Sequence, residues 1–157
     1  MALVSPVFFD TTVLLAGLID VGPASIPAQK IMTAVAGGRL RNPQTAWHCC
    51  LELYAVSTRL PEEFRLAPDD ARRLIQEEVL ARFHVEQLPA DTRRAFLTWA
   101  ARDRVAGGRI YDAHIAETAR QAGARAVVTD NRRHFSALTA HGIRLMNAEE
   151  LVAEGRL

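Results

Sequence analysis

The stretch that decides the fold is Phe8-Phe9-Asp10-Thr11-Thr12, in which a short apolar run ends in a carboxylate followed by two hydroxyl side chains. A second run, Ala126-Val127-Val128-Thr129-Asp130, ends in the same way far downstream. Both runs are typical of buried strands. Ligands of open α/β sheets bind at the carboxyl ends of the strands. The two runs therefore predict an acidic site at the carboxyl edge of a parallel sheet.

Strands and helices are expected to alternate along the rest of the chain. The pattern predicts strands at 4–10, 84–88, 126–129 and 143–146, and helices at 26–36, 46–60, 68–82, 91–103, 111–121, 132–140 and from 147 onward, whereas 40–42 is too short to assign. Thr45 is the expected N-cap of the helix over 46–60, and Asn147 with Glu150 forms an expected capping box. This alternation predicts an α/β fold, a single domain over residues 1–157 with a parallel sheet flanked by helices on both faces.

Composition limits the chemistry that the chain can perform. A length of 157 residues with 49% hydrophobic content suits one domain with a substantial core. The formal charge of +1 gives no overall attraction to nucleic acid, so such binding would depend on local arginine patches. Lys30 is the only lysine, which disfavours Schiff-base chemistry. No basic leader or membrane-length apolar run is present, so no membrane contact and a cytoplasmic location are expected. Cys49 and Cys50 are adjacent on an expected helix and are interpreted as buried free thiols.

Acidic residues stand at four suggestive positions, and each has an ordinary explanation when taken alone. Asp10 and Asp130 follow strands, where Asp often serves as a turn or N-cap residue. Asp112 stands in the first turn of a helix, where the helix dipole favours a negative charge. Glu52 lies in an apolar helix and either pairs with His48 at i,i+4 on the surface or faces a pocket.

Taken together, these carboxylates indicate a metal site. Neighbouring carboxylates repel one another and take up protons unless a cation is present. Oxygen ligands without thiolate partners suit Mg²⁺ or Mn²⁺. A site of this kind cleaves phosphodiesters by polarising the phosphate and activating a water molecule, with one or two metal ions.

The motifs, in order, resemble those of PIN-domain ribonucleases, and more narrowly those of VapC-type toxins of type II toxin–antitoxin systems. The resemblance extends from Val7 to about Met146 and rests on four motifs together: DTTVLLAG from Asp10, CCLELYAV around Glu52, GGRIYDAHIAETA around Asp112, and AVVTDNRRHF ending at Phe135. It implies a parallel sheet flanked by helices, with an acidic cluster that binds Mg²⁺ or Mn²⁺.

The resemblance also implies site residues, with Asp10, Glu52 and Asp112 as the first three acidic positions. Family members often carry a fourth carboxylate where Asn131 stands, so either Asp130 or Asn131 completes the site, because adjacent side chains in an extended segment point to opposite faces. Thr11 and Thr129 either orient water or a carboxylate or bond to local backbone. Glu117, five residues beyond Asp112, is expected to face solvent.

Arginines flank the expected acidic pocket in the sequence. Arg109 precedes Asp112, and Arg132 and Arg133 follow Asn131. These cations are either solvated surface residues or contacts to RNA phosphates. The resemblance implies an RNA substrate, a small antitoxin partner and a homodimer, for which apolar residues of 26–35 serve as an interface or belong to the core.

Competing readings explain less of the sequence. A haloacid-dehalogenase-like phosphatase needs a second Asp two residues after the first, where Thr12 stands, and a receiver domain needs paired early acids and a later lysine. A PIN module that has lost catalysis and binds RNA or protein remains the alternative, because Asn131 replaces a carboxylate. The sequence therefore predicts a metal-dependent endoribonuclease acting as a toxin.

Overall fold

The chain forms one five-stranded parallel sheet with strand order β3-β2-β1-β4-β5. The computed structural model describes residues 3–157. The strands are β1 (Val7–Phe9), β2 (Pro43–Ala46), β3 (His84–Glu86), β4 (Ala126–Val128) and β5 (Arg144–Met146). The predicted α/β fold with a parallel sheet is confirmed. Because the strand order reverses at β1, the carboxyl end of this central strand is the expected place for a ligand.

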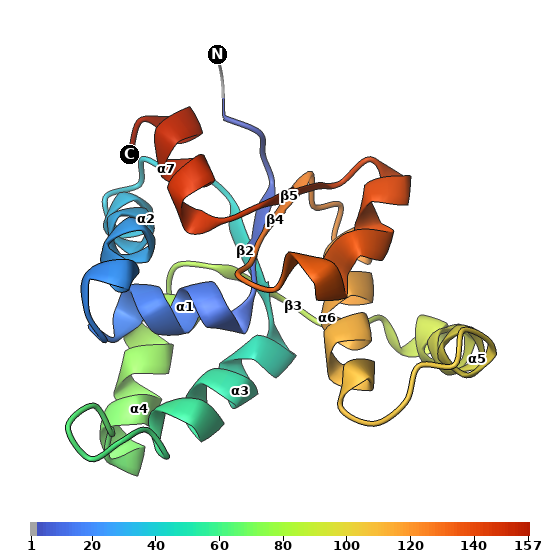
Figure 1. Ribbon diagram of the computed structural model, residues 1–157, viewed down its shortest axis with the longest axis horizontal. Coiled ribbons are helices and arrows are strands. Elements are labelled where there is room, and N and C mark those ends of the chain that lie inside the picture. Colours follow the sequence, from blue (N-terminus) through green and yellow to red (C-terminus); the bar gives the residue numbers. More distant parts are fainter. Residues whose placement is uncertain (1–2) are drawn as a thin grey trace.

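Helices cover both sides of the sheet (Figure 1). The α-helices are α1 (Thr11–Leu18), α2 (Ile26–Ala36), α3 (Trp47–Ser57), α4 (Pro68–Leu74), α5 (Arg93–Arg102), α6 (Arg109–Gln121) and α7 (Ala148–Gly155). Short 3₁₀ segments are η1 (Pro23–Ser25), η3 (Ala90–Thr92) and η4 (Arg132–His141), and η2 (Ile75–Leu80) is a π-helical continuation of α4. Figure 1 shows α1, α2 and α7 on one side of the sheet and α6 with the orange segment η4 on the other.

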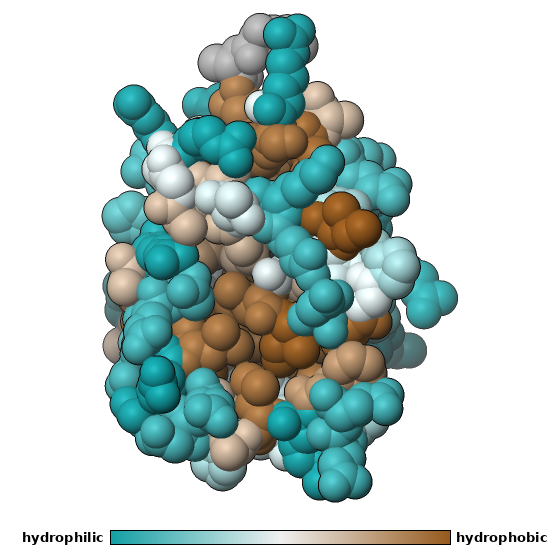
Figure 2. Space-filling view, turned by 90° about the vertical axis from the view of Figure 1, so that its left-hand side faces the viewer, coloured by the Kyte–Doolittle hydropathy of each residue, from teal (hydrophilic) through white to brown (hydrophobic). Residues whose placement is uncertain are grey.

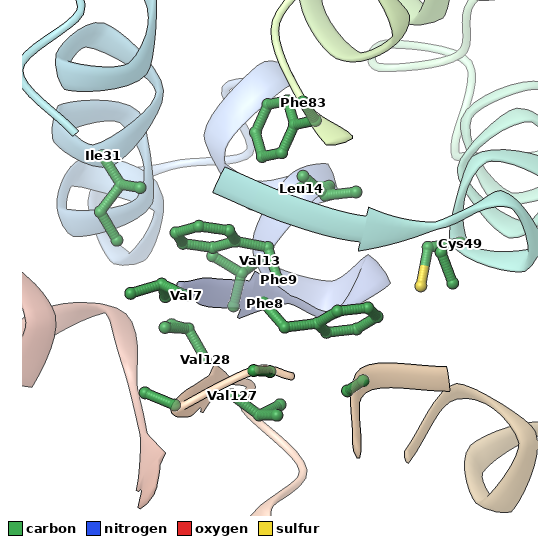
Figure 3. Close-up of a cluster of buried hydrophobic side chains, with 14 of the residues drawn as sticks. Val7, Phe8, Phe9, Val13, Leu14, Ile31, Cys49, Phe83, Val127 and Val128 are labelled. Atoms are coloured by element: carbon green, nitrogen blue, oxygen red, sulfur yellow. The ribbon is translucent and has the colours of Figure 1, made fainter. Parts of the chain in front are cut away.

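The central strand is wholly buried because both faces of the sheet are covered. Val7, Phe8 and Phe9 are at most 1% exposed. Figure 3 shows the rings of Phe8 and Phe9 on opposite sides of β1, as strand geometry requires. The ring of Phe9 meets Phe83 edge to face with centroids 5.8 Å apart. This packing fixes β1, and with it the residues that follow its carboxyl end.

Helices α1 and α2 pack closely through Gly17. A Cβ atom at Gly17 would lie 2.5 Å from the Cγ atom of Met32 and 2.8 Å from the carbonyl oxygen of Ala28. Such contacts are shorter than packed atoms tolerate, so only glycine fits at this position. Residues Ala28, Ile31, Met32, Ala34 and Val35 of α2 are buried in the core, whereas Ile26 at the start of the helix is 50% exposed.

One sequence expectation around β2 is wrong: Ala46, not Thr45, is the N-cap of α3. The strand β2 occupies Pro43–Ala46, directly after the segment 40–42 that the sequence left unassigned. The Thr45 hydroxyl instead donates to the carbonyl of Phe9 at 2.8 Å. Pro43 is compatible with the first position of this strand, where its missing N–H costs little.

Helix α1 was not predicted, although Asp10, the last residue of the expected strand, is its N-cap. The helix expected over 68–82 changes to π-helical geometry at Ile75. The expected capping box of α7 is confirmed: the Glu150 N–H donates to Asn147 Oδ1 at 2.8 Å. Cys49 and Cys50 are free and buried, as expected. Among the described residues no single helix is long and apolar enough to cross a membrane; α1 and the segment 23–36 meet that test only as a pair bent by 117°.

Candidate functional site

Asp10 stands at the carboxyl end of β1 and is held by three hydrogen bonds. It is the N-cap of α1, and its Oδ1 accepts from the Thr11 backbone N–H at 2.8 Å. Its Oδ2 accepts from the hydroxyls of Thr129 at 2.8 Å and Thr12 at 3.3 Å. Asp10 is 4% exposed, and burial raises its pKa, although these hydrogen bonds oppose the shift and the charge of Asp112 adds to it. The carboxylate is therefore both fixed in position and electrostatically costly.

Glu52, on α3, faces the same charges. Burial, with the negative charges of Asp10 and Asp112, raises the pKa of Glu52 to about 7. Its Oε1 lies 3.0 Å from His48 Nε2, but this buried oxygen has no aligned hydrogen-bond donor among residues 3–157. Glu52 therefore contacts His48, as the i,i+4 reading expected, and the charges of Asp10 and Asp112 also act on its carboxylate.

Asp112 lies in the first turn of α6, as the sequence predicted. Its Oδ2 is 2.8 Å from Nδ1 of His134, which belongs to η4. The pKa of His48 is lowered by burial, against the opposing charge of Asp112. Asp112 thus contributes to the electrostatics of Asp10, at the end of β1, and of Glu52 and His48, which both lie on α3.

The carboxylates of Asp10, Glu52 and Asp112 suit a hard divalent cation, but their oxygens do not surround one common point. Within residues 3–157 no three His, Cys, Asp or Glu side chains stand close enough together to hold a metal ion. Glu52 and Asp112 are each drawn towards a histidine, His48 and His134 respectively. The Glu52 Oε1 atom without a hydrogen-bond donor and the raised pKa values of Glu52 and Asp10 are features that a bound cation would relieve.

Asp130 and Asn131 are both exposed and follow β4. The Asp130 N–H donates to Thr12 Oγ1 at 3.3 Å, and the Asn131 N–H donates to Thr129 Oγ1 at 2.9 Å. Their backbone groups therefore hold the two threonine hydroxyls that donate to Asp10. Asp130 is not among the charges that shift the pKa values of Asp10 and Glu52. The electrostatic cluster therefore consists of Asp10, Glu52 and Asp112.

The two threonines have different environments. Thr129 is fully buried, and its hydroxyl donates to Asp10 while accepting from the Asn131 N–H. It therefore orients the Asp10 carboxylate. The hydroxyl of Thr11 is buried without a hydrogen-bond partner among the described residues. Of the two alternatives for Thr11, the local backbone bond is not formed.

The flanking arginines separate into two groups. Arg109 and Arg133 line a cavity of about 230 Å³ together with Asp112 and His134, and within residues 3–157 neither forms an ion pair. Arg132 pairs with Glu150 of α7 instead. Arg109 and Arg133 therefore share a cavity with Asp112, whereas Arg132 lies against α7.

Two further side chains differ from the sequence analysis. Glu117 is half-buried and accepts from the Arg120 guanidinium at 2.6 Å, which lowers its pKa, so its expected solvent-facing position is wrong. The sequence analysis missed His134, whose contact with Asp112 joins η4 to α6. Its one signal in the sequence is its position four residues after Asp130, in the segment that follows β4.

Comparison with known proteins gives consistent matches. The model of the PIN domain family matches residues 6–133. Ribonuclease VapC27 of Mycobacterium tuberculosis is 36% identical over 85 residues, which are 54% of this chain and 60% of VapC27. Ribonuclease VapC40 of the same species is 33% identical over 85 residues, 54% of this chain and 62% of VapC40. The alignments thus span about 60% of the length of these curated relatives.

Solved structures share the fold. VapC20 of Mycobacterium tuberculosis, a sarcin–ricin-loop-cleaving toxin, superposes with a TM-score of 0.62 at 18% identity, covering 84% of this chain and 94% of VapC20. VapBC-1 of nontypeable Haemophilus influenzae gives 0.59 at 17% identity, covering 91% of this chain and 98% of that one. VapBC2 of Rickettsia felis, bound to a DNA fragment from its promoter, gives 0.59 at 13% identity over 90% and 97%.

Proposed function

The chain belongs to the PIN-domain family, and from this premise we propose that it is a metal-dependent endoribonuclease that acts as the toxin of a toxin–antitoxin pair. The ribonuclease names of VapC27 and VapC40 support the activity. The observation that carries the proposal is the acidic cluster itself. Burial raises the pKa values of Asp10 and Glu52, and the charges of neighbouring carboxylates add to both shifts, so a cation beside them would stabilise the charged forms.

Asp10, Glu52 and Asp112 would hold the cation, and Asp130 or Asn131 would complete its surroundings. Mg²⁺ or Mn²⁺ in this position would polarise the scissile phosphate and supply an activated water. Thr129 keeps the Asp10 carboxylate aimed at the cluster through its 2.8 Å hydrogen bond. Glu52 and Asp112 would exchange their contacts with His48 and His134 for the cation, since both histidine contacts lie at the partly exposed mouth of the site.

RNA would bind through its phosphates at the rim of this cluster. Arg109 and Arg133 flank Asp112 and carry charges that no carboxylate within residues 3–157 neutralises. Two guanidinium groups in the same cavity as Asp112 would attract a backbone phosphate that must approach the carboxylates. Arg132 would contribute less, because it is paired with Glu150.

An antitoxin would cover an apolar groove on the opposite side of the molecule from α5. Figure 2 shows apolar side chains gathered in a hollow on this face, with polar side chains around them. A cavity of about 440 Å³ lies there between the end of α1 and α4, lined by Leu18, Ile19, Leu66 and Leu74 and rimmed by Asp20, Asp70, Arg73 and Glu77. The apolar face of a helix with charged flanks fits such a groove.

A homodimer would use α3 rather than α2. Trp47, Leu51 and Tyr54 follow a helical spacing and are 41%, 52% and 39% exposed, and Tyr111 of α6 is also exposed. Exposed aromatic and aliphatic side chains in one patch are typical of interface cores. Most apolar residues of α2, in contrast, are buried in the core, and only Ile26 among its large apolar side chains is exposed.

The proposed nuclease activity is tested with the purified chain and structured RNA. We expect cutting with Mg²⁺ or Mn²⁺, none with a chelator, and none in the Asp10→Asn or Asp112→Asn variants, which remove charge but retain shape. Each variant's circular dichroism spectrum should match that of the wild type. Metal-independent cutting, or full activity in either variant, would refute the site assignment. Binding of RNA without cutting under every metal condition would favour a PIN module that has lost catalysis.

A further inference from the structure

A cleft between α5, α6 and η4 begins at Asp112 and extends away from the sheet. Its first part is the 230 Å³ cavity that contains Asp112, Arg109 and Arg133, and its second part is a cavity of about 610 Å³. The two share the lining residues Trp99, Asp103, Ala113, Ala116 and Ala137, so they form one continuous cleft. In Figure 1, α5 stands at the edge of the molecule with α6 as its neighbour.

Trp99 is the largest side chain that lines both parts of this cleft. It is half-buried on α5, and its ring lies 6.1 Å from that of Phe96, which also lines the second part. Across the cleft the helices present alanines, Ala113 and Ala116 on α6 and Ala137 on η4. An aromatic wall facing small side chains leaves a slot for a flat group.

Charge sets the direction of a ligand in the cleft. Arg109 and Arg133 are at the end that contains Asp112 and would attract a phosphate. Asp103 lines both parts, as Trp99 does, and its carboxylate, 3.5 Å from the Arg102 guanidinium, would accept hydrogen bonds from an exocyclic amino group. The first part, at 230 Å³, is smaller than the roughly 300–1,000 Å³ of sites for drug-sized molecules, and so suits a single ring system.

We propose that this cleft is a nucleotide subsite, in which an unpaired base of the RNA next to the scissile phosphate stacks on Trp99 while its phosphate contacts Arg109 and Arg133. The inference rests on the proposed ribonuclease function and adds a base-binding role for Trp99, with Asp103 at the base edge. Stacking on an aromatic side chain suits single-stranded RNA, whose bases are free to leave the helix. The subsite therefore selects unpaired substrate.

The test uses Trp99 as its own reporter. Trp47 and Trp99 are the only tryptophans, so a Trp47→Phe background makes fluorescence specific to Trp99. The Asp10→Asn substitution is added so that RNA binds without being cut, and Mg²⁺ is present. The probes are a short single-stranded oligoribonucleotide and the same oligonucleotide with abasic sites, which keeps every phosphate. We expect the first to quench Trp99 fluorescence and the abasic probe to leave it unchanged.

Affinity variants give the second readout, measured by anisotropy of a labelled oligoribonucleotide with wild-type Trp47. Trp99→Ala should weaken binding about ten-fold and Trp99→Phe only about two-fold, because phenylalanine still stacks. Leu97→Ala is the matched control, since Leu97 lies on the same helix, is 62% exposed and lines neither part of the cleft. It should bind as the wild type does.

Several results would overturn the subsite. Equal quenching by the abasic probe, or equal affinity of Trp99→Ala and Leu97→Ala, would show that no base stacks on Trp99. A change in Trp99 fluorescence with protein concentration or on adding an antitoxin, but not with RNA, would assign the cleft to a protein partner. Cleavage by the wild-type chain is measured separately: base-dependent quenching without any cleavage would defeat the proposed nuclease and keep the subsite, and cleavage unaffected by Trp99→Ala would do the reverse.

Discussion

Replacing Glu52 with Gln should stabilise the metal-free protein above neutral pH. The substitution keeps the size of the side chain but removes the charge that burial, Asp10 and Asp112 oppose. Glu52 has a pKa of about 7 in the folded chain against an ordinary 4.5, so folding favours its protonated form. Stability from this group is therefore lost as pH rises from about 4.5 to about 7, and the loss is complete above that window.

The magnitude follows from the same pKa values. A rise from 4.5 to about 7 corresponds to ~3 kcal/mol between the protonation states. The Glu52 side chain is 37% exposed, and solvent screening reduces the expected effect to about 1 kcal/mol. For a chain of this size, that raises the melting temperature of Glu52→Gln above the wild type by about 2–4 °C at pH 8.

Thermal unfolding with chelator, at pH values between about 4.5 and 8, is the assay. The difference between Glu52→Gln and wild type should be small at the acidic end and largest at pH 8. Glu62→Gln, at an exposed glutamate outside the site, is the control and should show no such trend. With Mn²⁺ at about 100 times its dissociation constant the wild type should gain ~2.7 kcal/mol, and Glu52→Gln clearly less.

Two results would refute this reasoning. A difference between Glu52→Gln and wild type that does not change with pH would mean that Glu52 carries no electrostatic cost in the folded chain. Equal stabilisation of both proteins by Mn²⁺ would mean that Glu52 does not hold the cation.

The remaining predictions concern the residues around the cluster. Arg133→Ala should lower kcat/KM for RNA about ten-fold and reduce the slope of log affinity against log salt by about one, whereas Arg132→Ala should leave both near wild type, because Arg132 pairs with Glu150. Equal losses in the two variants would contradict the separation of these arginines. Thr129→Val should destabilise the fold by about 1–3 kcal/mol in chemical denaturation, because it removes one hydrogen bond to the buried Asp10 carboxylate and the acceptor of the Asn131 N–H. Thr129→Ser keeps the hydroxyl and should retain most of that stability. A fully stable Thr129→Val would show that the hydroxyl contributes nothing.

The sequence by itself determined the strands that lead to the site. Apolar runs before Asp10 and Asp130 identified β1 and β4, because a strand covered on both faces must be apolar throughout. The first-turn position of Asp112 and the capping box at Asn147 were equally legible, because helix ends have local chemical rules. The strand Pro43–Ala46 was not predicted, since local propensity made Thr45 an N-cap where the sheet required a strand residue.

Only the tertiary structure decided which side chains meet. The Thr45 hydroxyl bonds to Phe9, His134 contacts Asp112, and Arg132 pairs with Glu150. Each of these contacts joins two different elements of the fold. The tertiary structure also separated Asp130 from the charges that raise the pKa of Glu52. Residue spacing specifies direction within one strand or helix, but distances between elements depend on how the sheet and helices pack. The acidic residues were therefore readable from the sequence, and their partners were set by packing.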